Sequence, residues 1–133
     1  MNASAFAVTS LYAAVLGLLA ALLTVRVIVN RVKTGVQAGD GGNAELAQAI
    51  RAHANLAEQG PFAIILIGLA EAGGLSVLAL HGLGLVLLAG RFANAWGLSR
   101  SLGPTKPRQL GAGLTLLVVV AASIAILVRS FAR

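Results

Sequence analysis

The first 25 residues of the chain contain no charged side chain. About 20 consecutive apolar residues suffice for a helix to cross the roughly 30 Å hydrocarbon core of a bilayer. Over all 133 residues, 58% are hydrophobic and 11% are charged, with a mean hydropathy of +0.89. An ordinary soluble domain is much less apolar. The sequence therefore predicts an integral membrane protein of the all-α class.

Three further apolar segments follow the first one. Gly73 and Gly74 separate the second from the third, and Pro104 and Pro107 interrupt the stretch before the fourth. Glycine and proline disfavour the continuation of a helix. We expect one domain, residues 1–133, that forms a transmembrane four-helix bundle with helices near 5–30, 44–72, 75–99 and 109–130. A cleaved signal peptide is a competing interpretation of the first segment, but no basic residue precedes it and its apolar run is unusually long.

The second segment begins in polar sequence and is longer than the roughly 20 residues that cross a bilayer core. Its first turns should therefore project into water. Pro61 lies in its interior and removes one backbone hydrogen bond, which predicts a local distortion that could widen a cavity.

Basic residues mark two of the three expected connections. They are Arg26, Arg31 and Lys33 at the first connection, and Arg100, Lys106 and Arg108 at the third. The second connection has no Lys or Arg. The positive-inside rule places the basic connections in the cytoplasm, so the polar start of the second helix should open there.

One face of the second helix carries three polar residues. Arg51, Asn55 and Glu58 stand at positions i, i+4 and i+7, so they form a stripe about 10 Å long. Ionisable groups cost on the order of 2.5 kcal/mol or more each at a bilayer centre and normally face a bundle interior or a wet cavity. A small zwitterionic ligand fits this stripe. On the third helix, Arg91 lies near the expected depth of Glu58 as a candidate partner, and Asn94 shares the face of Arg91.

Several other kinds of site are excluded. The chain has no cysteine, so disulfides and thiolate metal sites cannot form, and His53 and His81 are too far apart for a local metal motif. The segment GDGGN (39–43) lacks the Lys-Ser/Thr ending of a phosphate loop and fits a turn in which Asn43 caps the second helix. The net charge of +6 is spread over span ends, so membrane topology and an anionic ligand explain it better than nucleic acid does.

Other interpretations stay open at this point. Arg51, Glu58 and Arg91 could form an ion-pair network that only fixes helix register, which would make the chain a non-catalytic scaffold. A small four-helix exporter has a similar length, but it should carry an acidic residue in its first helix, where this chain has none. Trp96 is either an interfacial anchor, which we favour, or a ring that contacts a ligand. Glu71 is expected at a water-exposed helix end.

The MAPEG family, the membrane-associated proteins in eicosanoid and glutathione metabolism, has a second-helix signature that this chain resembles in RAHANLAE (51–58) and the following Pro61. The segments GDGGN (39–43) and GRFANAWGLSR (90–100) resemble the corresponding loop and third helix of bacterial members. The resemblance covers nearly the whole chain, and the second-helix motif is its more specific part. It implies a homotrimer of four-helix protomers in a bacterial inner membrane, with glutathione bound between subunits in clefts that open to the cytoplasm.

The resemblance also implies a function. It is that of a glutathione transferase or a glutathione-dependent peroxidase, acting on a lipophilic electrophile that enters from the membrane lipid. Arg108 is similar to an arginine that stabilises the thiolate in some members, because a nearby cation lowers the pKa of a thiol. Arg31 is similar to a basic residue that ends their first helix. The expected glutathione-binding residues are Arg31, Arg51, Asn55, Glu58, Arg91 and Asn94.

Three positions depart from the family pattern. Many members have Tyr where Gln59 stands, His where Asn94 stands, and Tyr near Trp96. These departures remove aromatic and hydroxyl contacts that elsewhere bind glutathione or orient its sulfur. Catalysis therefore follows less directly from the resemblance than the fold does.

Overall fold

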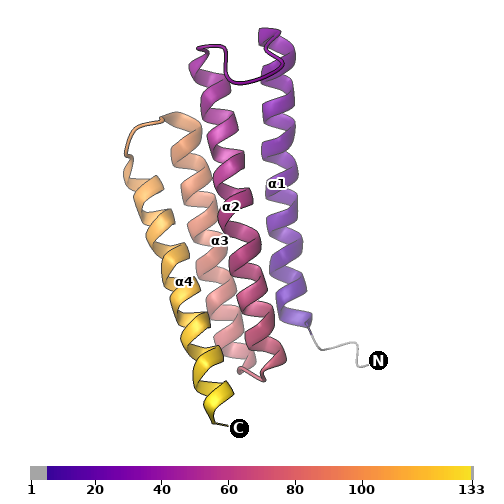
Figure 1. The fold of residues 1–133 in the computed structure, drawn as a ribbon, viewed down its shortest axis with the longest axis vertical. Helices are drawn as coiled ribbons and strands as arrows, with labels where there is room; N and C mark the ends of the chain where they lie inside the picture. The colour runs from indigo at the N-terminus through magenta and orange to yellow at the C-terminus, as the bar shows by residue number, and fades with distance from the viewer. Residues whose placement is uncertain (1–5, 133) are drawn as a thin grey trace.

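The computed structural model describes residues 6–132, which form four helices joined by short connections (Figure 1). The helices are α1 (Ala7–Thr34), α2 (Ala44–Ala72), α3 (Val77–Arg100) and α4 (Lys106–Phe131). Each helix runs antiparallel to the one before it (Figure 1). The predicted all-α four-helix bundle is confirmed.

Two helix ends differ by three residues or more from the sequence-based expectation. α1 continues to Thr34 rather than ending near residue 30, and Gly35 ends it in the left-handed conformation with φ of 69°. Glycine adopts this conformation without the steric cost of a Cβ atom. α4 begins at Lys106 rather than near residue 109, because Pro107 lies in its first turn. Proline is tolerated there, since its missing N–H would have no helical partner.

The connection between α1 and α2 is the predicted turn. The side chain of Asn43 accepts a hydrogen bond from the Leu46 amide at 2.9 Å and so caps α2. Asp40 accepts one from the Gly42 amide at 2.9 Å. Gly41 and Gly42 have positive φ angles of 58° and 76°, which glycine adopts readily.

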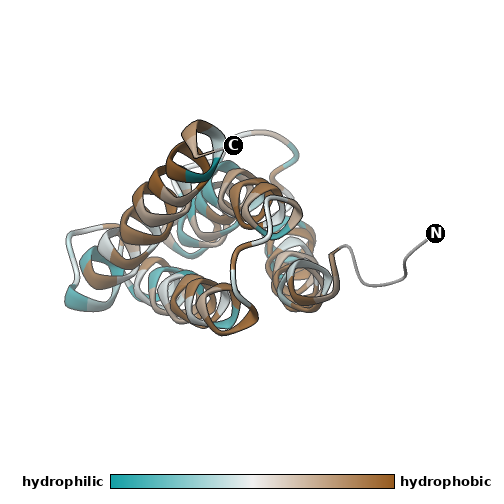
Figure 2. Ribbon diagram, turned by 90° about the horizontal axis from the view of Figure 1, so that it is seen from below, coloured by the Kyte–Doolittle hydropathy of each residue, from teal (hydrophilic) through white to brown (hydrophobic). Residues whose placement is uncertain are grey.

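The two inner helices of the bundle are α2 and α3, which contact each other and both outer helices. Within the described residues, α1 and α4 do not contact each other. The core is apolar, and its largest buried members include Leu16, Leu46, Ile67, Leu80, Leu87, Leu98 and Val118. Many large apolar side chains on all four helices face outward instead, and Figure 2 shows apolar residues along every helix. This distribution suits a lipid environment.

Three of the helices, α1, α3 and α4, are long and apolar enough to cross a membrane. α2 does not meet the same criterion, because its first half carries the polar stripe. Its two ends nevertheless join the end of α1 to the start of α3, which lie at opposite ends of the bundle (Figure 1). Since α1 and α3 are both apolar spans, α2 must cross between them as part of the bundle.

The end of the bundle that holds the connection between α2 and α3 is joined by polar contacts. Glu71 accepts hydrogen bonds from the amides of Val8 and Thr9 at 3.0 and 2.8 Å, and one from the Thr9 hydroxyl at 2.5 Å. Arg129 donates to the carbonyl oxygens of Gly73 and Gly74 at 2.8 and 2.6 Å. Glu71 thus lies at a helix end, as expected, but it is half-buried and bonded to α1 rather than simply exposed to water. Its carboxylate caps the start of α1, where the N-cap residue makes no side-chain cap.

Candidate functional site

Arg91 on α3 is the most deeply placed charged side chain of the predicted site, with only 2% of its surface exposed. Its Nη1 atom donates to the Asn55 Oδ1 atom at 3.0 Å, and its Nη2 atom donates to the Gly111 carbonyl oxygen at 3.2 Å. The guanidinium thus joins α2, α3 and α4. Its Nε atom is buried and has no hydrogen-bond partner in the structure. A buried cation whose partners are neutral oxygens is an unusual arrangement, because burial of an uncompensated charge is costly.

Close packing of α3 against α4 brings the Gly111 carbonyl within reach of Arg91. A Cβ atom at Gly111 would collide with the Gly90 carbonyl oxygen and would lie 2.6 Å from the Asn94 backbone nitrogen. A Cβ atom at Gly90 would lie 3.0 Å from the Gly111 carbonyl oxygen. The two helices can approach this closely only because both positions are glycine.

Asn94 lies one turn after Arg91 and is 3% exposed. Its Nδ2 atom donates to the Arg108 carbonyl oxygen at 3.2 Å, which ties α3 to the first turn of α4. The Arg108 side chain donates through Nη1 to the carbonyl oxygens of Leu102 and Gly103 at 2.7 and 3.3 Å. The remaining nitrogens of this half-buried guanidinium have no protein partner among the described residues.

Two adjoining pockets lie beside these side chains. One has a volume of about 270 Å³, and its lining includes the polar residues Asn55, Gln59 and Arg91 beside apolar ones. The other, of about 360 Å³, is lined by residues that include Asn55, Asn94 and Arg108. Both are lined by Asn55 on α2 and Ala112 on α4. We call the two together the α2–α4 groove.

The structure therefore brings four of the predicted residues to one groove, namely Asn55, Arg91, Asn94 and Arg108. Arg51 and Glu58 lie on the same helix as Asn55 but are exposed. The expected pairing of Glu58 with Arg91 is not formed, and within residues 6–132 no ion pair joins Glu58 to Arg51 or Arg91. The reason is that the half-buried Asn55 amide and the Gly111 carbonyl already accept hydrogen bonds from the Arg91 guanidinium, whereas the Glu58 side chain is exposed on α2.

Arg31 lies apart from the groove. It donates through Nη1 to the carbonyl oxygens of Val36 and Gly39 at 3.2 and 3.0 Å, so it holds the connection between α1 and α2. The groove is on the α4 side of α2, and α1 does not contact α4 within the described residues.

Comparisons with known proteins show the family to which the chain belongs. The model of the MAPEG family matches residues 9–128. The chain belongs to the MAPEG family. It is 39% identical over 95 residues to the inner membrane protein YecN of Escherichia coli strain K12, an alignment that covers 71% of this chain and 72% of that protein. YecN of Escherichia coli O6:H1 matches to the same extent. This MAPEG protein is accordingly an integral membrane protein.

The three departures from the usual MAPEG pattern fall at different places. Gln59 lines the α2–α4 groove, so it brings an amide where a Tyr would bring a phenol. Asn94 is buried beside the groove and uses its amide to hold Arg108. Trp96 is 58% exposed and lines neither pocket of the groove, which favours the interfacial anchor over a ligand contact.

Sequence reasoning missed some lining residues of this MAPEG groove. Phe62, Gln109 and Thr115 line its pockets, and Thr115 donates to the same Gly111 carbonyl that Arg91 binds, at 3.0 Å. Phe62 follows Asn55 by seven residues, a helical spacing that could have placed it on the same face. Nothing in the local sequence indicated that Gln109 and Thr115 on α4 line the groove, because the orientation of α4 depends on its packing against α3.

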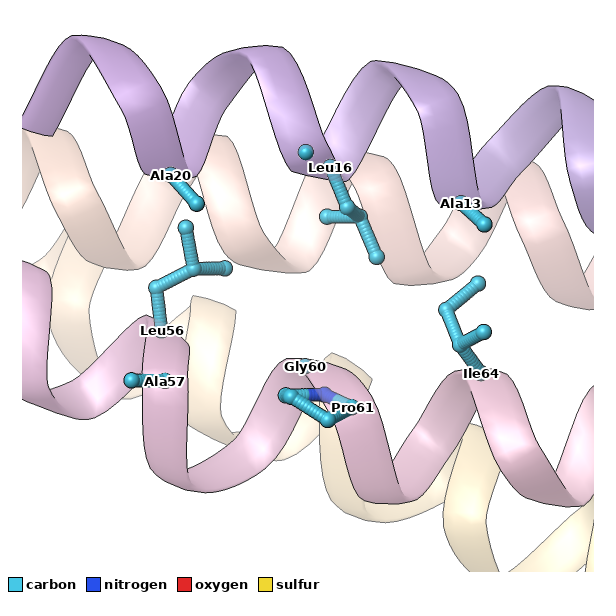
Figure 3. Close-up of a pocket in the computed structure, with 9 residues that line it drawn as sticks. Ala13, Leu16, Ala20, Leu56, Ala57, Gly60, Pro61 and Ile64 are labelled. Atoms are coloured by element: carbon cyan, nitrogen blue, oxygen red, sulfur yellow. The ribbon is translucent and has the colours of Figure 1, made fainter.

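A separate apolar pocket of about 220 Å³ lies between α1 and α2, next to Gly60 and Pro61 (Figure 3). The side chains that line it are all apolar, among them Leu16, Leu56 and Ile64. The sequence predicted a local distortion at Pro61 that could widen a cavity. The pocket does lie beside Pro61, and α2 continues as one helix through this proline. The pocket faces α1, on a different side of α2 from the groove. Because its lining is apolar, it offers no side chain that could bind a charged ligand.

Proposed function

We propose that this protein binds glutathione in the α2–α4 groove and uses its thiol against a lipophilic electrophile that enters from the bilayer. The observation that carries the proposal is Arg91, a buried cation with neutral partners and an unpartnered Nε atom beside the groove. Glutathione is a peptide anion that carries both carboxylates and an ammonium group. A carboxylate is the natural charge-assisted partner of a guanidinium.

The residues of the groove, together with the exposed Arg51 and Glu58 on α2, suit the chemical groups of glutathione. Arg91 and the exposed Arg51 can hold carboxylates, and Glu58 can hold the ammonium group. The amides of Asn55 and Gln59 can bind the peptide bonds. Arg108 at the cytoplasmic end can lower the pKa of the thiol, because a cation stabilises the thiolate form.

The reaction has two candidate forms. In a transferase, the glutathione sulfur forms a bond to an electrophilic carbon, the leaving group departs with its electron pair, and the thiol proton passes to solvent. In a peroxidase, two glutathione molecules are oxidised to the disulfide while a lipid hydroperoxide is reduced to the alcohol and water. Assays with an aryl halide and with a lipid hydroperoxide distinguish the two.

We further propose that the site is shared between copies of the chain in a homotrimer. Arg31 lies at the end of α1, and α1 is separated from the α2–α4 groove by α2. A neighbouring protomer can bring its own Arg31 to the groove, whereas the same protomer cannot without rearrangement. The exposure of Arg51 and Glu58 also suits a site completed at a subunit boundary. The basic connections at this end of the bundle support a site that opens to the cytoplasm, by the positive-inside rule.

Substitution of the exposed charges tests the binding site. Arg51→Gln and Glu58→Gln should each weaken glutathione binding by roughly 2–5 kcal/mol, the typical cost of truncating one partner of a desolvated charge contact. Calorimetric titration of the detergent-purified protein measures the affinity. Glu45→Gln is the matched control, since Glu45 is an exposed acidic residue in the first turn of the same helix, six residues before Arg51. Unchanged affinity in both site variants, with assembly intact, would reject this assignment in favour of a scaffold role.

Arg108→Gln tests the role in thiolate formation separately. The variant should retain measurable glutathione binding but lose the ultraviolet difference absorbance of the bound thiolate. Lys106→Gln removes an exposed positive charge two residues away and should keep that absorbance. An Arg108 variant with an unchanged thiolate signal would remove Arg108 from the mechanism.

A further inference from the structure

One face of α3 is exposed and apolar along nearly the whole helix. Leu78, Leu85, Phe92 and Trp96 are 85%, 61%, 48% and 58% exposed. Their spacings of seven, seven and four residues place them on one side of the helix. We call this the outer face of α3. At about 1.5 Å per residue it extends roughly 27 Å from Leu78 to Trp96, which is close to the thickness of the hydrocarbon core.

The outer face ends in an aromatic ring stacked with a cation. The Arg100 guanidinium lies 4.0 Å from the centroid of the Trp96 ring. Both side chains are exposed, and no carboxylate pairs with Arg100 among the described residues. Trp and Arg at the end of an apolar span lie at the level of lipid headgroups.

Other cations surround this end of α3. Arg26 from α1 donates to the Ser99 carbonyl oxygen at 3.2 Å and also to the Ser99 hydroxyl. Lys106 begins α4 and is exposed. The connection between α3 and α4 has no acidic residue, and among the described residues no ion pair forms with Arg26, Arg100 or Lys106, so these positive charges are unpaired.

We propose that the outer face of α3 binds an anionic phospholipid, with its phosphate on Arg100 and its acyl chains against Phe92 and Leu85. Trp96 to Leu85 covers about 16 Å of helix, which matches one leaflet of a core roughly 30 Å thick. The apolar stripe alone would suit any lipid or a second copy of the chain. The unpaired positive charge at its end favours an anionic headgroup, since cations at the cytoplasmic side attract anionic lipids. This site is distinct from the glutathione groove.

Trp96 reports on this site directly because it is the single tryptophan of the chain. The protein is placed in nanodiscs that contain equal amounts of phosphatidylglycerol and phosphatidylcholine, with bromine atoms on the acyl chains of one lipid or the other. Brominated chains quench tryptophan fluorescence on contact. The quenching of Trp96 should show that phosphatidylglycerol is about fivefold more abundant next to this ring than phosphatidylcholine.

Two charge variants locate the preference. Arg100→Gln should reduce the preference toward one, and raising the salt concentration should weaken it in the unaltered protein. Lys33→Gln is the matched control, because it removes an exposed cation from the same side of the membrane at the end of α1, and it should leave the preference unchanged.

Two results would overturn the proposal. Equal quenching by both brominated lipids would make Trp96 an unselective interfacial anchor. Protection of Trp96 from both lipids would mean that a second copy of the chain covers the outer face. Neither result bears on glutathione binding, which calorimetry measures independently.

Discussion

At the residue scale, Arg91 shows both the reach and the limit of sequence reasoning. Its presence in an apolar helix predicted a functional position, since ionisable residues in membrane spans rarely occur without a role. Its partners could not be predicted. Glu58 was the obvious choice by charge and depth, but the structure uses Asn55 and the backbone carbonyl of Gly111. A carbonyl group has no sequence signature, because every residue carries one.

Glu71 gives a second test at this scale. Its carboxylate accepts two amide hydrogen bonds at the start of α1, where a negative charge is also favourable to the helix dipole. Glu71→Ala should lower the free energy of unfolding by about 1 kcal/mol, as the loss of a helix cap typically does. Thermal unfolding in detergent measures the change. Glu45→Ala on the exposed first turn of α2 serves as the comparison and should have the smaller effect, and equal effects would contradict the capping role.

At the scale of elements, the sequence predicted helix type and order well. The second helix was predicted with its observed bounds, because Asn43 and Gly73 mark its ends. The sequence could not show which glycines face another helix. Gly111 and Gly113 are two residues apart on α4, yet a Cβ atom at Gly111 would meet the α3 backbone while one at Gly113 would meet open space.

This pair predicts opposite effects of the same substitution. Gly111→Ala should destabilise the protein by about 1–3 kcal/mol, because the α3 backbone must move to accommodate the methyl group. It should also weaken glutathione binding, since Arg91 depends on the Gly111 carbonyl. Gly113→Ala should be neutral or stabilising by up to about 1 kcal/mol, from the higher helix propensity of alanine. Thermal unfolding of the two variants side by side checks this, and a Gly111 variant as stable as the Gly113 variant would contradict the close packing.

At the scale of the whole molecule, the fold and the membrane class followed from composition and span pattern, whereas a site between subunits cannot be read from one protomer.

Sharing of the site can be tested by complementation. Trimers made only of Arg31→Gln protomers, or only of Arg108→Gln protomers, should bind glutathione weakly or form little of its thiolate. In mixed trimers about one site in four should regain both arginines, because protomers combine at random in a closed ring. Native mass spectrometry verifies the trimer and its mixing, and mixed trimers without recovery would place Arg31 outside a shared site.

The central claim is that the α2–α4 groove binds glutathione, and direct titration of the unaltered, detergent-purified protein tests it most simply. Calorimetry should show saturable heat of glutathione binding, together with an ultraviolet difference absorbance from the bound thiolate. The Arg51→Gln variant, titrated under the same conditions, should show a much weaker isotherm. An assembled protein that gives no saturable heat and no thiolate signal would contradict the claim.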